Sequence, residues 1–319
     1  MDLEVAIERF ELARTFAISR GAKREAVVVV ARVTDGDLTG WGEAVPYGRY
    51  GETAEGVARL IRSIQMPVTR AALQDLLPPG AARNALDCAL WDLEAQQADR
   101  SLLAEVVASP TAFTLSLGPP EVMAQSAAQA RGYGALKLKL AGEGDFERVA
   151  AVRAAAPDQD LIVDANEGWR VEDYVRLVPA FEQLGVTLIE QPFPEGADDV
   201  LETLTRPIPV AADESFHHRG GLDALQGLYD VLNVKLDKTG GLTEAFASVE
   251  AARAMEFEVM LGCMVCTSLS IAAALPLMGH ARFVDLDGPL WLSADRVPGV
   301  RFENGQVQAP RRGFWGGPR

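Results

Sequence analysis

Short apolar runs alternate with Ala-rich stretches of helical periodicity from residue 112 to residue 288, and a polar or Gly/Pro turn separates each run from the stretch that follows it. The runs are FTLSLG (113–118), ALKLKL (135–140), LIVDAN (161–166), TLIEQP (187–192), IPVAADES (208–215), VLNVKLD (231–237), EVMLGC (258–263) and RFVDLD (282–287). Successive strand and helix units of this kind close most naturally into a (β/α)8 barrel. A doubly wound open sheet is disfavoured because no G-x-G-x-x-G follows the first strand and no P-loop is present.

The first part of the chain, residues 1–111, has a different pattern. Two runs typical of strands, VAIERFEL and AVVVVARV, precede a turn at Asp35-Gly36, and helical periodicity follows over residues 53–65 and 81–98. This order predicts an α+β domain that caps the barrel.

The last part, residues 289–319, contains RFENGQVQ, in which Asn304-Gly305 predicts a tight hairpin turn. We expect this tail to return to the cap. The predicted fold class is therefore α/β, a (β/α)8 barrel over residues 112–288 with an α+β capping domain built from the N-terminal segment and the C-terminal tail.

Charge excludes some partner classes. The chain has 45 acidic and 30 basic residues and a net charge of −15, so we expect no nucleic acid partner and no membrane surface. No apolar run is long enough to span a bilayer, and the start MDLEVAIERF is charged throughout, which predicts a cytoplasmic protein. Three cysteines do not make a disulfide framework, and the single C-x-x-C at Cys263 and Cys266 is a weak signal for zinc or redox chemistry.

Three carboxylates follow successive apolar runs. Asp164 ends LIVD, Glu190 ends TLIE and Asp213 follows PVAA, so the barrel would gather them at the mouths of adjacent strands. A single such residue is most simply a helix N-cap. Three in consecutive units would repel one another without a counter-ion, which favours a metal site and, for oxygen ligands, Mg²⁺. Mn²⁺ is an open substitute.

Lysines lie on both sides of this carboxylate trio. Lys137 and Lys139 alternate with leucines in ALKLKL and therefore share one face of their strand, and Lys235 follows VLNV. A metal-bound carboxylate has a more acidic α-proton, which a neutral lysine can remove from one face while an ammonium returns a proton to the other. This arrangement predicts inversion of a stereocentre.

The last apolar run ends in Asp285-Leu286-Asp287, and strand alternation directs both acids to the same side. Because a metal is already provided for, the pair suits a cationic group such as a substrate's α-ammonium. The alternative is ordinary turn chemistry before Gly288.

The ordered set K-x-K, Asp, Glu, Asp, Lys and D-x-D resembles the muconate-lactonizing subgroup of the enolase superfamily. The strings GAARNALDCALWDLEA, LIVDANE, NVKLDKTGGLTEA, MLGCMVCTS and VDLDGPLWL are similar to those of its dipeptide epimerases of the L-Ala-D/L-Glu type, over nearly the whole chain. The resemblance implies acid/base roles for Lys139 and Lys235, Mg²⁺ ligation by Asp164, Glu190 and Asp213, contact of Lys137 with the substrate carboxylate, contact of Asp285 and Asp287 with the dipeptide N-terminus, and a pocket lined by Thr114 and Cys263.

The resemblance also implies that cap loops choose the second residue of a dipeptide substrate. The first candidate loop is SRGAKREA, and the second is VPYGRYGE. Family members specific for Ala-Glu carry an arginine that aligns with Lys23 here, and Arg24 is next to it. These two basic residues favour an anionic second residue such as Glu. The activity implied by the resemblance serves murein peptide metabolism.

Other functions stay open at this stage. An o-succinylbenzoate synthase or an N-acylamino acid racemase would share the proton-abstraction step, but their substrates have no ammonium for the D-x-D. A Schiff-base aldolase would leave the carboxylates unexplained, and a non-catalytic barrel would not need this set of residues. The sequence is compatible with a homo-oligomer and leaves the oligomeric state open.

Overall fold

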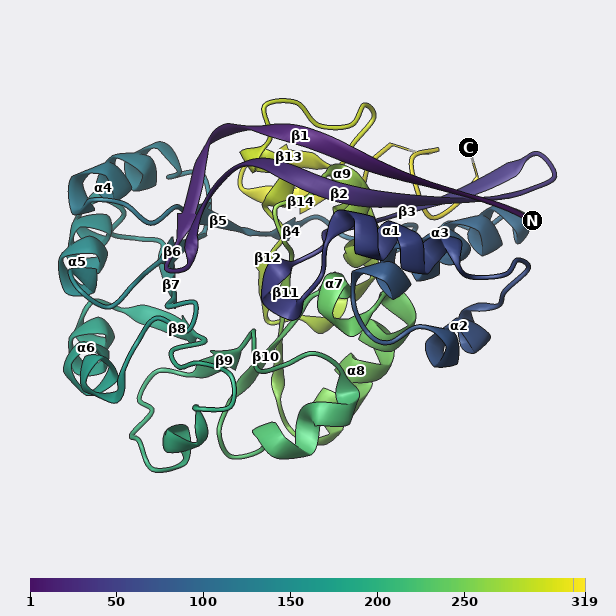
Figure 1. Cartoon of the computed structure of the whole chain (residues 1–319). Helices are drawn as coiled ribbons and strands as arrows, with labels where there is room; N and C mark the ends of the chain where they lie inside the picture. The colour runs from purple at the N-terminus through teal and green to yellow at the C-terminus, as the bar shows by residue number, and fades with distance from the viewer. Residues whose placement is uncertain (312, 319) are drawn as a thin grey trace.

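A ring of eight parallel strands forms the body of the molecule (Figure 1). The computed structural model describes residues 1–311 and 313–318. The strands are β5 (Ala112–Leu115), β6 (Ala135–Lys139), β7 (Asp160–Asp164), β8 (Val186–Glu190), β9 (Val210–Ala212), β10 (Val231–Val234), β11 (Glu258–Gly262) and β12 (Phe283–Asp285). They pair in chain order, and each lies on a predicted apolar run. The predicted (β/α)8 barrel is confirmed.

The barrel closes between β12 and β5 through side chains, since the strand ladder ends at these two strands. The Leu286 N–H donates to Thr111 Oγ1 at 2.9 Å, and the Thr114 N–H donates to the Asp287 carboxylate at 2.7 Å. These bonds pair backbone groups that would otherwise be left unpaired at two strand edges. They also hold Asp287 at the barrel mouth.

Helical segments follow the strands around the outside of the ring. They are α4 (Pro120–Gln129), α5 (Asp145–Ala155), α6 (Val171–Gln183), η2 (Asp199–Glu202), η3 (Arg219–Leu225), α7 (Leu236–Thr239), α8 (Leu242–Ala254), α9 (Ser268–Ala274), η4 (Leu275–His280) and η5 (Gly288–Trp291). The expectation of an Ala-rich helix after every strand is wrong after β8 and β9, where only the 3-10 segments η2 and η3 form. Gly220 and Gly221 lie inside the second of these segments, and glycine is unfavourable inside a helix.

Strand alternation decides which residues face the inside of the barrel. Ile162 and Leu188 belong to a small buried apolar cluster that is separate from the larger core between strands and helices. This cluster forms the barrel floor and consists of Ala112, Ile162, Leu188, Ala211, Val231 and Met260. Asp164 and Glu190 each lie two residues further along the same strands, so they point to the same inner side, above the floor.

The cap consists of an antiparallel sheet and three helices within the described residues. Its elements are β1 (Asp2–Ile18), β2 (Gly21–Asp35), β3 (Leu38–Ala44), η1 (Gly48–Tyr50), α1 (Ala54–Arg62), α2 (Arg70–Leu76) and α3 (Ala81–Gln97). Helix α3 packs so closely on β3 that a Cβ atom at Gly42 would lie 2.0 Å from the Ala85 carbonyl oxygen. Strands β1 and β2, the Asp35-Gly36 turn and helices α1 and α3 are as predicted, whereas β3 and α2 were not expected.

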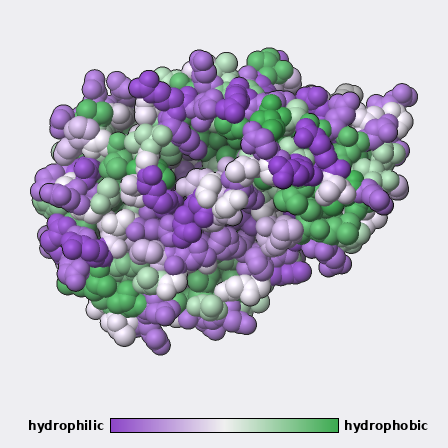
Figure 2. Space-filling view, viewed as in Figure 1, coloured by the Kyte–Doolittle hydropathy of each residue, from purple (hydrophilic) through white to green (hydrophobic). Residues whose placement is uncertain are grey.

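The β1–β2 hairpin arches over the barrel, and its tip lies beside β6 and β7 (Figure 1). At the tip, Ser19 Oγ donates to the Asn166 carbonyl at 2.8 Å, and the Ala17 N–H donates to Ser116 Oγ at 2.8 Å. Figure 2 shows hydrophilic side chains gathered across the centre of this face. The segment SRGAKREA was expected to be a loop. It forms a tight turn at residues 19–20 and then the start of β2.

The tail forms a small sheet with the segment that precedes the barrel. This sheet contains β4 (Ser109–Pro110), β13 (Arg301–Glu303) and β14 (Gln306–Gln308). The predicted hairpin turn is present, with φ of 52° at Asn304 and 73° at Gly305. Trp315 Nε1 donates to the Trp41 carbonyl at 2.8 Å, so the tail contacts the cap. The division of the chain at residues 111 and 288 stays a prediction.

None of the described helices combines the length and the apolar character needed to cross a membrane.

Candidate active site

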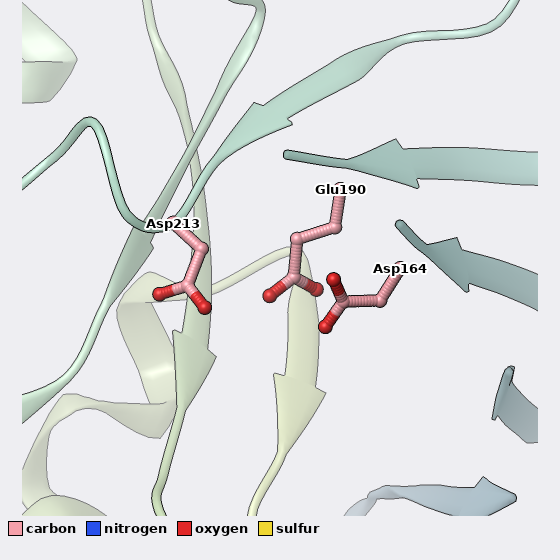
Figure 3. A group of neighbouring side chains, drawn as sticks. All are labelled: Asp164, Glu190 and Asp213. Atoms are coloured by element: carbon pink, nitrogen blue, oxygen red, sulfur yellow. The ribbon is translucent and has the colours of Figure 1, made fainter. Parts of the chain in front are cut away.

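Three buried carboxylates meet at the mouth of the barrel. Asp164 ends β7, Glu190 ends β8, and Asp213 follows β9. Each offers one oxygen within 4.8 Å of the others, and Figure 3 shows the three groups directed toward one another. Three buried anions that share one space have the donor chemistry of a site for a hard divalent cation. The triad is able to hold a metal.

The predicted lysines contact this triad. Lys139 Nζ lies 2.5 Å from Asp164 Oδ2, and Lys235 Nζ lies 2.6 Å from Asp213 Oδ2. Lys137 Nζ lies 2.7 Å from Glu190 Oε2. In the strand order, β6 and β10 are four places apart in a ring of eight, so Lys139 and Lys235 approach the triad from opposite sides.

A fourth lysine holds Asp213 from outside the cavity. Lys238 is buried, and its Nζ lies 2.7 Å from Asp213 Oδ1 and 2.5 Å from the Asp213 carbonyl oxygen. Burial disfavours a charge on Asp213, but Lys235 and Lys238 outweigh this effect and hold the pKa of Asp213 well below its ordinary value. This carboxylate therefore stays ionised throughout the neutral range.

Glu190 has the opposite balance. Burial, together with the neighbouring Asp164, raises the pKa of Glu190 from 4.5 to about 7, although Lys137 opposes the shift. Asn233 Nδ2 donates to Glu190 Oε1 at 2.8 Å, and this neutral donor does not compensate the charge. A full negative charge on Glu190 is therefore costly in the folded protein at neutral pH.

Mg²⁺ is expected to raise the unfolding temperature more at pH 8 than at pH 5. The folded pKa of Glu190 lies above its ordinary value, so the stability that Glu190 contributes is present below pH 4.5 and is lost as the pH rises through about 7. A bound cation would compensate the ionised triad at pH 8, whereas protons compete with it at pH 5. Thermal unfolding of chelator-treated protein with and without Mg²⁺ measures this difference, and equal shifts at the two pH values would contradict it.

Two further carboxylates lie on the β12 side of the mouth. Asp285 Oδ2 lies 2.8 Å from Lys137 Nζ, whereas the buried Asp285 Oδ1 has no hydrogen-bond partner among the described residues. Burial and the neighbouring Asp285 raise the pKa of Asp287 to about 6, against the hydrogen bond from the Thr114 N–H. An unpartnered buried acceptor is costly, so this place suits a donor that carries positive charge.

A cavity of about 420 Å³ brings most of the predicted residues together between the cap and the barrel mouth. Its lining includes Lys23, Thr114, Lys137, Lys139, Asp213, Lys235, Cys263, Asp285 and Asp287. Asp164 and Glu190 are fully buried and do not line it. Cys88, Cys263 and Cys266 are free thiols, and burial raises the pKa of the Cys266 thiol well above its ordinary value, which opposes a nucleophilic role.

Lys23 and Arg24, both candidates for contact with the second residue of a dipeptide, lie on opposite faces of strand β2. Lys23 lines the cavity, and its Nζ lies 5.7 Å from the centre of the Phe16 ring. Arg24 is exposed and does not line the cavity, because adjacent residues on β2 point to opposite faces. Arg24 is therefore not in a position to replace Lys23 at this site.

Two arginines of the cap form ion pairs with glutamates at the barrel mouth. Arg20 lies 2.5 Å from Glu214 Oε1 and donates to the Asn166 carbonyl at 2.7 Å, and Arg49 lies 2.8 Å from Glu167. Both arginines belong to the candidate cap loops SRGAKREA and VPYGRYGE, but their partners were not predicted. The available signal was the place of the partners along the chain, since each directly follows a strand-end segment that carries a predicted ligand.

Two family models match the chain. The model for the N-terminal domain of mandelate racemase/muconate lactonizing enzyme matches residues 2–105, and the model described as enolase C-terminal domain-like matches residues 121–314. The chain belongs to the mandelate racemase/muconate lactonizing enzyme family. Its cap and its barrel correspond to the two domains of this family, which places the carboxylate triad in a catalytic barrel of the enolase superfamily.

Two curated relatives that resemble this chain over most of its length carry names that refer to glutamate. The L-Ala-D/L-Glu epimerase of Escherichia coli (strain K12) is 46% identical over 318 residues, which cover 96% of this chain and 98% of the relative. The N-acetyl-D-glutamate racemase of Pseudoalteromonas sp is 42% identical over 301 residues, which cover 91% and 95%.

Solved structures of the family superpose closely on this chain. An enolase family member from Agrobacterium tumefaciens, with bound sodium and L-Ala-L-Glu, has a TM-score of 0.96 at 44% identity and covers 98% of this chain and 99% of that protein. A dipeptide epimerase from Enterococcus faecalis V583, complexed with Mg and L-Leu-L-Tyr, has a TM-score of 0.89 at 28% identity and covers 99% and 97%.

Proposed function

We propose that this protein is a dipeptide epimerase that inverts the α-carbon of the C-terminal residue, with L-Ala-L-Glu and L-Ala-D-Glu as its preferred pair in murein peptide metabolism. The observation that carries the proposal is the placement of Lys139 and Lys235 on opposite sides of one carboxylate triad, in a cavity that also contains Asp285 and Asp287. A substrate bound between the lysines would present one face of its α-carbon to each.

The chemistry needs one acid and one base. Mg²⁺ held by Asp164, Glu190 and Asp213 would stabilise the negative charge that develops on the substrate carboxylate as the α-proton leaves. Of Lys139 and Lys235, the neutral amine removes the proton and the ammonium on the other face delivers one, so each epimer uses the pair in the opposite sense. Lys137 would add a positive charge beside the substrate carboxylate.

The two ends of the cavity support a zwitterionic dipeptide with an acidic second residue. Asp285 and Asp287 would receive the α-ammonium, which supplies a donor to the unpartnered Asp285 Oδ1. Arg20 and Arg49 are committed to carboxylates of the barrel loops, whereas Lys23 has no ion pair among the described residues. Burial and the nearby Lys139 and Lys235 lower the pKa of Lys23 to about 8, so an anionic side chain would stabilise its charge.

Replacing Lys23 with methionine is expected to lower kcat/KM for Ala-Glu by about 10-fold to 100-fold, the scale of one charge-assisted contact. The same variant should lose less activity, or gain some, with an apolar second residue. The matched control is Arg24→Met, because this neighbour is exposed and outside the cavity. Equal effects of the two substitutions on Ala-Glu would contradict the assignment of Lys23.

The experiment that tests the function is deuterium uptake from heavy water. We expect the protein with Mg²⁺ to exchange and invert the α-proton of the C-terminal Glu in Ala-Glu, and to lose this activity with a chelator. Mass spectrometry of a dipeptide library measures exchange, and chiral chromatography measures inversion. Metal-dependent exchange with other dipeptides only would overturn the Ala-Glu preference, and no exchange with any dipeptide would overturn the epimerase.

N-acetylglutamate racemisation is the second candidate, since a relative that is 42% identical carries the name of that activity. This reaction uses the same proton transfer and a substrate with the same acidic side chain, but N-acetylglutamate has no α-ammonium group. The buried carboxylates Asp285 and Asp287 favour the dipeptide, because an N-acetyl group supplies no positive charge and Lys137 contacts only one oxygen of Asp285. Exchange rates of Ala-Glu and N-acetylglutamate, compared in one assay, distinguish the two.

We further propose that the enzyme works in the cytoplasm with Mg²⁺, and that Mn²⁺ can substitute. The free thiols Cys88, Cys263 and Cys266 support a reducing compartment, and the all-carboxylate ligand set suits either cation. Assembly into a homo-oligomer stays a prediction.

A further inference from the structure

Behind the carboxylate triad, one buried amide joins two strands. Gln191 directly follows Glu190, and its side-chain Oε1 accepts hydrogen bonds from the Asp213 N–H at 2.9 Å and the Ser215 N–H at 3.1 Å. Its own N–H donates to the Ala211 carbonyl at 2.9 Å. Gln191, which follows the metal-ligand candidate Glu190, therefore binds the backbone of the next candidate, Asp213.

The other end of the amide is equally occupied. Gln191 Nε2 donates to the Phe193 carbonyl at 2.9 Å, to Ser215 Oγ at 2.8 Å and to the Tyr229 hydroxyl at 3.0 Å. Both hydroxyls donate to Asp198 Oδ2, Ser215 at 2.5 Å and Tyr229 at 2.6 Å, so their oxygens face Gln191 as acceptors. The two hydrogens of Nε2 are shared among the three acceptors, and only an amide with its oxygen toward the Asp213 and Ser215 N–H groups satisfies all of these groups.

The backbone of Gln191 is itself unusual. Its φ is 37°, in the left-handed region that residues with a Cβ seldom adopt, and the next residue is Pro192. The side-chain hydrogen bonds hold this conformation in place. Because Glu190 precedes this bend, the same bonds also limit the freedom of the Glu190 backbone.

None of the network residues touches the cavity. Gln191, Ser215, Tyr229 and Asp198 are absent from its lining, so they cannot contact a substrate there. These residues are connected to the site through the peptide N–H of Asp213, whose carboxylate faces those of Asp164 and Glu190. Lys238 donates to the carbonyl and carboxylate oxygens of Asp213. Asp213 is thus held at its N–H by Gln191, at its carbonyl and Oδ1 by Lys238, and at Oδ2 by Lys235.

We propose that Gln191 is a positioning residue that sets the affinity for the divalent metal by fixing the backbone of Asp213, with Asp198, Ser215 and Tyr229 as its support. This inference rests on the proposed metal role of Asp213. Groups that orient metal ligands without touching the metal typically change affinity by about 10-fold to 100-fold when they are removed.

The test compares two variants of the full chain with a matched control. Gln191→Met keeps the length of the side chain but leaves the Asp213 and Ser215 N–H groups without their acceptor. Tyr229→Phe removes one hydroxyl that supports the amide and leaves the acceptor in place. Gln183→Met is the control, since Gln183 is exposed at the end of α6. Isothermal titration of chelator-treated protein with MgCl₂ measures the Kd, and thermal unfolding without metal reports folding.

We expect the Mg²⁺ Kd to rise about 10-fold to 100-fold in Gln191→Met, to rise less in Tyr229→Phe, and to stay unchanged in Gln183→Met. A lower unfolding temperature with an unchanged Kd in Gln191→Met would overturn the inference, because the network would then only stabilise the fold. If Gln191→Met does not fold, Tyr229→Phe decides, and a wild-type Kd in that variant overturns it. Absence of Mg²⁺ binding by the wild-type protein would instead refute the metal role, and the inference with it.

Discussion

Replacing Lys139 or Lys235 with methionine is expected to slow epimerisation by about 10²-fold to 10⁴-fold or more, because each inversion needs both an acid and a base. Each variant should still exchange the α-proton of one epimer of Ala-Glu, the one whose proton faces the remaining lysine. The two variants should therefore be complementary, one exchanging only the L epimer and the other only the D epimer at the second residue. Proton exchange in heavy water, measured separately for the two epimers, reports this pattern.

The variants are expected to fold, since neither carboxylate partner loses all of its cations. In Lys139→Met, Asp164 keeps Lys137 Nζ at 3.3 Å, and in Lys235→Met, Asp213 keeps Lys238 Nζ at 2.7 Å. Circular dichroism and Mg²⁺ titration serve as controls. Inversion at the wild-type rate by either variant would refute the two-base mechanism, and loss of exchange of both epimers in a folded variant would show that the lysines do not act independently.

Glu190→Gln is expected to weaken Mg²⁺ binding and to slow α-proton exchange by about 10²-fold or more, the scale of a lost electrostatic contact in a water-excluded site. The same substitution should raise the unfolding temperature of the metal-free protein at pH 8. Burial raises the pKa of Glu190 to about 7, so an ionised Glu190 destabilises the folded state at that pH, and a neutral amide does not. Function and stability would then change in opposite directions.

The pH dependence supplies the control for this prediction. At pH 5 Glu190 is largely protonated in the folded protein, so the stabilisation of Glu190→Gln over wild type should nearly vanish. Calorimetry of both proteins at pH 5 and pH 8, without metal, measures the two differences. A variant that is less stable than wild type at pH 8 would indicate that hydrogen bonds to Lys137 and Asn233 outweigh the charge, and would contradict the electrostatic account.

Much of the barrel and the composition of its centre could be predicted from the sequence. A strand of period two directs alternate residues to one face, and parallel strands end at one rim. Asp164 and Glu190 at the ends of their apolar runs therefore had to lie close together. Lys137 and Lys139 shared a face for the same reason, and the structure places both on the cavity. Helix α2 and the 3-10 segments after β8 and β9 were missed, because short helical turns have little periodicity of their own.

Choices that depend on distant partners were decided by the tertiary structure. Lys23 and Arg24 were equivalent as neighbours in a basic segment, and only the placement of the β1–β2 hairpin over the mouth turned one inward and the other to solvent. Glu214 follows a predicted ligand, yet its ion pair with Arg20 joins residues 194 positions apart. No local pattern contains such a pair.

Gln191 shows this division most clearly. By itself the sequence indicated that an apolar run ends in Glu190, which is a matter of local periodicity. The left-handed φ of Gln191 and the reach of its amide to the Asp213 N–H were decided only when β8 and β9 packed side by side. The physical reason is that alternation along a strand is a property of neighbouring residues, whereas a hydrogen bond between strands requires the barrel to close first.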